Sequence, residues 1–239
     1  MWDEKKRTAN YDNLTWVKDQ DYLKHIVKMC DLKKGMKVCD VGTGTGVVAE
    51  ALSHSGAHVD AIDNSKVMLE MAKRNRSADN ITYMLEDIQT YGPENTYDRV
   101  VARMVFHHVD DDKKAIQNCM KMLKPDGRLI IAEGTPPRGA KHFFTKMMAI
   151  KEKRRTYDVD DLVVLMDGFK KVDLDIFVTK DMSIKNWLDN SGLKPHEISE
   201  IKRLHIGAPK HVCKAYNMRL KDADIIMDWE ITVISGVKA

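Results

Sequence analysis

Three glycines stand at alternate positions in the segment Val38–Gly46, which reads Val-Cys-Asp-Val-Gly-Thr-Gly-Thr-Gly. The segment follows an apolar strand pattern and opens a helical one, and glycines in such a turn let the backbone bend tightly and approach a ligand closely. The spacing is not the G-x-G-x-x-G of dinucleotide-binding proteins, because position 47 is Val. The sequence also contains no G-x-x-x-x-G-K-[ST] phosphate loop. The segment therefore predicts a cradle for a small ligand and disfavours a nicotinamide dinucleotide.

Two carboxylates follow the next two strand patterns along the chain. Asp63 ends the run Ala61-Ile62-Asp63, about 20 residues past the glycine loop, where a carboxylate can accept both hydrogens of a ribose diol. Asp87 ends the following run and can receive an exocyclic amine of adenine. Either acid alone can also cap a helix. Both acids at the ends of consecutive strands after this loop favour nucleotide binding.

An alternation of short apolar runs and helical patterns must position these residues. The expected strands are 37–41, 58–62, 81–85, 99–103 and 128–132, and the expected helices are 47–53, 65–74 and 112–123. Strands and helices in alternation predict a parallel sheet covered on both faces. Because ligands bind beyond the carboxyl ends of the strands in such sheets, we expect the loop and both acids at one edge.

The pattern changes after Glu133. Helices are expected over 141–155, 183–190 and 209–218, and strands over 172–178 and 225–235. The stretch of about 180–222 therefore predicts a helical insertion between two late strands. A connection that long usually serves a function, so we expect it to form the wall of an acceptor pocket and to close over it with the N-terminal segment.

The composition fits one folded domain over residues 1–239, with 43% hydrophobic and 31% charged residues. The 39 basic and 36 acidic residues are too balanced to indicate a nucleic-acid-binding protein on charge alone. No apolar run approaches the roughly 18 residues of a membrane helix, and Met1–Arg7 lacks the apolar core of a secretory signal. The four cysteines form no close pair, which predicts a reducing cytoplasm.

On these motifs the chain resembles the class I S-adenosylmethionine-dependent methyltransferases, in the group similar to small-molecule enzymes of ubiquinone and menaquinone biosynthesis. The matching stretches are Val38–Gly46, Ala61–Ala72, Leu85–Ile88, Tyr97–Val109 and Met122–Glu133. The resemblance implies an α/β fold: a Rossmann-like, seven-stranded, mostly parallel sheet with an antiparallel final strand and a helical insertion between the last two strands. It implies a helical lid over residues 1–35, a cofactor-binding half over 36–135 and an acceptor-side half over 136–239.

The resemblance also implies the cofactor S-adenosyl-L-methionine and its product S-adenosyl-L-homocysteine. The cofactor-binding residues that it implies are Asp40, Gly42, Thr43, Gly44, Gly46, Asp63, Asn64, Asp87, Ile88, Arg103 and Met104. The loop residues would hold the methionine part, and the acid of the second strand would hold the ribose. The residues after the third strand would border adenine, and the last two would line the floor beside the sulfonium.

The residues that could act on a methyl acceptor begin with His107 and His108, directly after the fourth strand. Imidazole can take a proton at neutral pH, so both are candidate catalytic bases, with packing or substrate lining as the alternative. The candidate substrate-binding residues are Tyr11, Trp16, His108 and Trp187. In related enzymes the N-terminal segment folds over the cofactor, and Trp187 lies on the insertion. Filling of the core by these aromatic residues is the alternative.

No metal site is expected, because Glu200, His205 and His211 do not fall on one helical face. We therefore expect a methyltransferase with a small-molecule acceptor and no nucleic-acid partner. The alternatives are an RNA or protein methyltransferase that docks through the basic helix 141–155, a non-catalytic S-adenosylmethionine-binding protein, and a nicotinamide oxidoreductase. A solvated surface is the simpler interpretation of that basic helix. Oxygen, nitrogen, carbon and sulfur acceptors all fit the sequence.

Overall fold

The computed structural model describes residues 8–152 and 154–239, which divide into two compact units. The first unit contains the described residues up to Asp19 together with Gly134–Asp158 and Phe177–Ile231. The second unit contains Gln20–Glu133, Val159–Ile176 and Thr232–Ala239.

The second unit holds five parallel strands. They are β1 (Lys37–Val41), β2 (His58–Asp63), β3 (Ile81–Leu85), β4 (Tyr97–Arg103) and β5 (Leu123–Thr135), the last of which runs on into the first unit. Their order in the sheet is β3-β2-β1-β4-β5, and each neighbouring pair is parallel. Strand order therefore reverses direction at β1, which is where ligands bind in open sheets of this kind.

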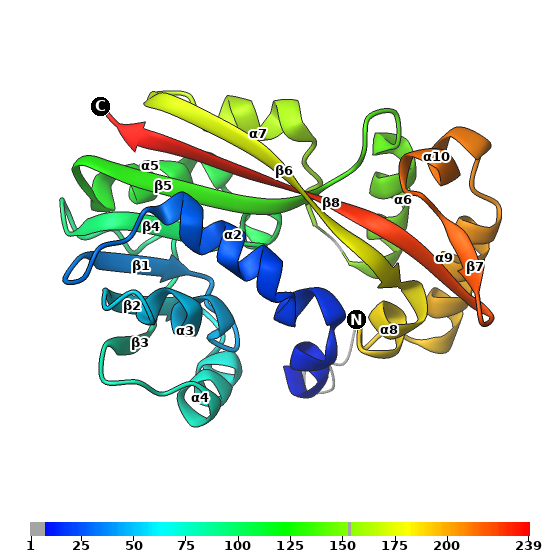
Figure 1. Cartoon of the computed structure of the whole chain (residues 1–239), viewed down its shortest axis with the longest axis horizontal. Coiled ribbons are helices and arrows are strands. Elements are labelled where there is room, and N and C mark those ends of the chain that lie inside the picture. Colours follow the sequence, from blue (N-terminus) through cyan, green and yellow to red (C-terminus); the bar gives the residue numbers. More distant parts are fainter. Residues whose placement is uncertain (1–7, 153) are drawn as a thin grey trace. The chain divides into compact units, whose positions relative to one another are not determined.

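The sheet continues from β5 through β8 (Asp224–Lys238) to β6 (Phe169–Ser183), and both of these strands contribute residues to each unit. In Figure 1 the arrowhead of β8 points opposite to that of β1, so the last strand is antiparallel to the first five. A short strand, β7 (Arg219–Lys221), pairs antiparallel with β8. The result is a mixed sheet that is parallel over most of its width.

Side-chain caps mark the starts of two helices in the second unit. The helices of this unit are α2 (Gln20–Cys30), α3 (Val47–Ser53), α4 (Lys66–Asn75), α5 (Asp112–Met122), α7 (Val159–Leu165) and the 3-10 turn η3 (Phe106–His108). The Ser65 hydroxyl accepts a hydrogen bond from the Met68 N–H at the start of α4, and the Asp111 carboxylate does so from Lys114 at the start of α5. Such caps satisfy backbone donors that a helix start would otherwise leave without partners.

The first unit is mainly helical. Its helices are η1 (Tyr11–Asn13), η2 (Thr15–Lys18), α6 (Lys141–Lys151), α8 (Ile184–Asp189), α9 (Pro195–Ile206) and α10 (Lys210–Ala215). Phe143 of α6 packs edge-to-face on His205 of α9, with ring centroids 5.3 Å apart, and lies 5.9 Å from the ring of Tyr216. These aromatic contacts join helices that are far apart in the sequence.

The predicted fold class is confirmed, and most expected elements lie within a few residues of the observed ones. β5 and β6 are longer than expected, whereas the helix expected over 141–155 ends at Lys151. Sequence patterns missed α7, because its β-branched valines disfavour a helix in isolation. In the N-terminal stretch expected to be helical, α2 is an α-helix and η1 and η2 are 3-10 turns, whereas Met1–Arg7 lies outside the described residues.

No helix in the described part of the chain is both long enough and apolar enough to cross a membrane.

Candidate cofactor and active site

The carboxyl ends of four strands meet at one edge of the sheet in the second unit. Asp40 of β1 pairs in register with Ala61 of β2, and Asp63 at the end of β2 pairs with Leu85 at the end of β3. On the other side of β1, Val41 pairs with Ala102 of β4. The register therefore brings the glycine loop, both predicted acids and the end of β4 to the same edge, as the strand pattern predicts.

The three loop glycines have different tasks, although all have positive φ. A Cβ on Gly42 would lie 2.4 Å from a methyl carbon of Val105, and one on Gly46 would lie 2.6 Å from the Tyr83 hydroxyl. A Cβ on Gly44, whose φ is +56°, would have no atom of the described chain within 4 Å. Packing therefore requires glycine at the two outer positions, whereas Gly44 faces open space of the kind a bound ligand needs.

Asp63 holds the loop against the start of α4. One carboxylate oxygen accepts a hydrogen bond from the Gly44 N–H and the other from the Ser65 N–H, each at 2.8 Å. Burial raises the pKa of this carboxyl, while the two N–H donors oppose the shift. A carboxylate offers about four acceptor positions. Two therefore remain for other donors, which matches the two hydroxyls of a ribose.

Asp40 is a buried acid directly below the loop. Its carboxylate accepts a hydrogen bond of 2.6 Å from the Thr43 hydroxyl. Burial raises the pKa of Asp40 to about 7, against the opposing effects of the Thr43 hydrogen bond and the Arg103 charge. An acid with a pKa this close to neutrality responds strongly to a cation placed beside it.

The segment after β3 is held by short-range contacts. One Asp87 oxygen accepts a hydrogen bond from the Gln89 N–H at 2.8 Å, and the carbonyl of buried Ile88 accepts one from the Asn118 amide at 2.6 Å. Asn64 is exposed between Asp63 and the cap residue of α4. The three predicted residues Asn64, Asp87 and Ile88 thus lie at the edge that carries the loop.

The end of β4 turns sharply. Met104 has a backbone φ of +58°, which residues other than glycine rarely adopt. Its N–H donates a hydrogen bond to the Ala132 carbonyl at 2.8 Å. Arg103 is buried, and its guanidinium lies 5.6 Å from the centre of the Tyr22 ring. Backbone strain of this kind is concentrated at functional sites.

The turn η3 contains both candidate histidines. His107 is buried and its Nδ1 lies 2.6 Å from a carboxylate oxygen of Glu133, whereas His108 is exposed with its ring centroid 4.1 Å from that of His107. Glu133 is a residue that motif reasoning missed. The available signal was a carboxylate at the end of the apolar run of β5, where a charge is rarely buried without a partner.

The residues predicted to bind the acceptor do not all belong to the same unit. Tyr11 and Trp16 stack edge-to-face at 5.9 Å, and buried Trp187 packs edge-to-face on Trp229 at 5.5 Å. All four belong to the first unit, whereas His108 belongs to the second. The role of these residues toward an acceptor remains a prediction.

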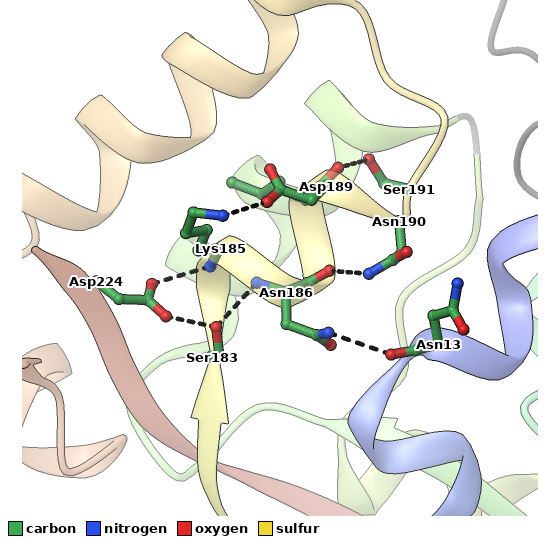
Figure 2. A network of polar contacts seen from close by, with 9 residues as sticks. Asn13, Ser183, Lys185, Asn186, Asp189, Asn190, Ser191 and Asp224 are labelled. Atoms are coloured by element: carbon green, nitrogen blue, oxygen red, sulfur yellow. Dashed lines mark hydrogen bonds and ion pairs between the residues drawn. The ribbon is translucent and has the colours of Figure 1, made fainter. Parts of the chain in front are cut away.

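A polar network connects α8 with the N-terminal segment inside the first unit (Figure 2). The Asn186 amide donates to the Asn13 carbonyl at 3.1 Å, and the Thr15 hydroxyl donates to the Asn186 side-chain oxygen at 3.0 Å. Ser183 caps α8 and donates its hydroxyl to Asp224. The structure therefore brings the N-terminal segment and the insertion into contact, and their closure over an acceptor remains a prediction.

The edge of the second unit fits S-adenosylmethionine on three observations. Gly44 leaves open space, Asp63 keeps two acceptor positions, and the buried Asp40 carboxyl has a pKa poised to ionise beside an ammonium group. By the predicted roles, these observations would concern the path of the cofactor across the loop, its ribose and its methionine amine.

Comparison with known proteins agrees with this geometry. Residues 39–131 match the family model described as a methyltransferase domain. A ubiquinone biosynthesis O-methyltransferase of Vibrio campbellii is 28% identical over 63% of this chain and 67% of its own length. One from Coxiella burnetii is 34% identical over 46% of this chain and 48% of its own. The chain thus spans about half the length of the Coxiella relative.

Solved structures show the same fold. The YcgJ protein of Bacillus subtilis superposes with a TM-score of 0.80 at 18% identity, over 91% of this chain and 98% of that one. Phosphoethanolamine N-methyltransferase 2 of Haemonchus contortus, in complex with S-adenosyl-L-methionine, gives 0.68 at 18% identity over 97% and 57%. Residues 39–131 therefore match a methyltransferase domain, and the chain has the fold of solved S-adenosylmethionine-dependent methyltransferases.

Proposed function

We propose that the protein transfers the methyl group of S-adenosylmethionine to a hydroxyl oxygen of a small-molecule acceptor. The observation that carries the proposal is the edge formed by Gly44, Asp63 and Asp40, which offers space, acceptors and a negative charge in one place. The relatives named as ubiquinone biosynthesis O-methyltransferases support oxygen as the accepting atom.

Bound S-adenosylmethionine supplies a methyl group on a positively charged sulfur, which is already reactive toward nucleophiles. The contribution of the chain is therefore mainly orientation, which is worth up to roughly 7–11 kcal/mol in well-aligned reactions. Asp63 would accept the ribose hydroxyls, Asp40 would pair with the ammonium group, and Asp87 would accept the adenine amine. Because Asp40 and Asp63 stand on neighbouring strands and Asp87 follows the next strand closely, the sheet sets their spacing.

The first unit supports a small acceptor over an RNA or a protein. Of the basic residues of the 141–155 segment, Lys141 pairs with Asp158 at 2.6 Å, and Lys151 and Arg154 both pair with Glu152. To bind a phosphate, these cations would have to give up their partners within the chain. The four free cysteines, three of them buried, support a reducing cytoplasm as the place of action.

The test is release of S-adenosylhomocysteine from a panel of small phenols, alcohols and amines, with an RNA hairpin and a basic peptide as further candidates. We expect turnover with a hydroxyl compound that changes little with ionic strength. Transfer to RNA, with a steep loss between low and moderate salt, would instead favour the nucleic-acid alternative. Cofactor binding without transfer to any of these compounds would contradict the proposal.

A further inference from the structure

Glu133 and His107 form a buried pair that the proposed cofactor contacts do not use. One Glu133 oxygen lies 2.6 Å from His107 Nδ1, and the other accepts a hydrogen bond from the Phe106 N–H at 2.7 Å. The side chains are 1% and 4% exposed. A single carboxylate on β5 therefore holds both the backbone and the ring of the turn that follows β4.

A purely structural role explains this pair poorly. Removing a carboxylate from water is costly, and well-packed apolar residues often replace a buried ion pair with no loss of stability. The pair lies at the carboxyl ends of β4 and β5, the side of the sheet on which ligands bind in this class of fold. Buried charged pairs at such positions are enriched among residues that take part in chemistry.

The contact also determines which ring nitrogen of His107 is basic. A carboxylate at Nδ1 keeps the proton of the neutral ring on that nitrogen, which makes Nε2 the nitrogen that can take up another proton. The negative charge also stabilises the imidazolium that results. Glu133 thus sets the tautomer, the orientation and the basicity of the ring together.

We propose that His107 is the general base of the reaction and that Glu133 is its positioning residue. The inference rests on the proposed function, because a hydroxyl acceptor must lose a proton when it is methylated. The acceptor O–H proton passes to Nε2 while an oxygen lone pair forms the new C–O bond. The electron pair of the broken C–S bond stays on sulfur, which becomes the neutral thioether of the product. The imidazolium then returns its proton to water.

Within the second unit, the described contacts place two titratable groups beside the His107 ring. They are Glu133, from β5, and His108, from the same turn. His108 is exposed, and its ring is tilted by 50° to that of His107. Of these two groups, only Glu133 favours the protonated ring, so its removal should have a recognisable signature.

The kinetic test compares Glu133→Gln, Glu133→Asp and His107→Gln with wild type, using the small phenol that turns over fastest. His107→Gln should lower kcat by about 100-fold or more, with cofactor affinity within a factor of two or so. Glu133→Gln keeps the shape of the pair but not the charge, so kcat should fall about tenfold or more and the acid limb of the pH profile should move about one pH unit lower. Glu133→Asp keeps the charge and should restore the wild-type position of that limb.

The matched control, His54→Gln, removes an exposed histidine at the end of α3 and should change none of these values.

A second readout needs no acceptor. Nitrogen-15 NMR of the histidine rings in the cofactor-free protein should show a protonated Nδ1 on His107, and a titration midpoint that falls in Glu133→Gln and returns in Glu133→Asp. The inference is overturned if wild type methylates a phenol while His107→Gln keeps its kcat, or if the midpoint is the same in all Glu133 variants. An inactive wild type with the expected NMR signature would instead overturn the proposed function and keep the His107–Glu133 pair.

Discussion

The acids of the cofactor edge in the second unit and the α8 network in the first unit find their partners at different separations along the chain. At the cofactor edge, Asp40 and Asp87 accept hydrogen bonds from residues three and two positions away, and Asp63 accepts them from residues two and 19 positions away. In the α8 network, Asn186 donates to a carbonyl 173 residues away, and Ser183 donates to a carboxylate 41 residues away. The acids of the cofactor edge are therefore held by nearby segments, whereas the α8 network forms only when distant segments meet.

The first unit also buries polar atoms that lack hydrogen-bond partners. Within the described residues of the first unit, Thr179 Oγ1, His205 Nε2 and Tyr216 Oη are buried without a hydrogen-bond partner. The acids of the cofactor edge all have partners. Since an unsatisfied buried polar group costs roughly 1–3 kcal/mol, we expect these three atoms to lower the stability of the first unit.

The largest expected effect separates the loop glycines. Gly44→Val should abolish measurable cofactor binding, a loss of about 100-fold or more in affinity, because its side chain would fill the open space in the cradle. Gly42→Ala should instead lower stability by about 1–3 kcal/mol, because its Cβ would collide with Val105. Calorimetry and chemical denaturation of both variants check this difference. Normal cofactor binding by Gly44→Val would mean that the glycine serves only the turn.

The next effect tests packing in the first unit. Trp187→Ala should lower the free energy of unfolding by about 3–5 kcal/mol, because a buried indole is lost from its contact with Trp229. Cofactor affinity should change little, since Trp187 and the cofactor edge belong to different units. If Trp187 also contacts the acceptor, the Michaelis constant for the acceptor should rise in the folded variant. Unchanged acceptor kinetics would limit Trp187 to the core.

The buried acid Asp40 should make the folded protein more stable at low pH than at neutral pH. Because burial raises the pKa of Asp40 to about 7, the folded state holds a proton that the unfolded state has lost between about pH 4 and pH 7. Stability should therefore fall as pH rises through this interval, by up to roughly 4 kcal/mol. Asp40→Asn should remove this component, which urea denaturation of the cofactor-free protein can measure. An equal pH slope in wild type and variant would contradict the assignment.

The smallest effect has the opposite sign and belongs to the first unit. Burial lowers the pKa of His205, whose Nδ1 donates to the Ile201 carbonyl at 2.7 Å. The unfolded state therefore takes up a proton first, and stability should fall as pH drops below about 6.5. His205→Gln should flatten this acid limb of the stability curve. If stability still falls at acid pH in the variant, groups other than His205 cause that fall.

Separation along the chain also explains what could be predicted from sequence. The glycine loop, Asp63 and Asp87 could be placed because each belongs to a short strand–turn–helix segment with a recognisable pattern. Glu133 could not be paired with His107 from the sequence, because 26 residues separate them and only the β4–β5 register brings them together. Likewise, no sequence pattern identified Thr15 or Asn13 as the residues that contact α8.

Calorimetric titration of Asp63→Ala with S-adenosylmethionine tests the central claim, that the cofactor binds at the edge formed by the glycine loop and the strand-end acids. Loss of a charged acceptor for two ribose hydroxyls should weaken binding by about 1.5–3 kcal/mol, which is roughly 10- to 150-fold in the dissociation constant. Thermal unfolding of the same protein establishes that the variant is folded. Weakened binding of this size by a folded variant is the predicted result, and an unchanged dissociation constant would contradict the account.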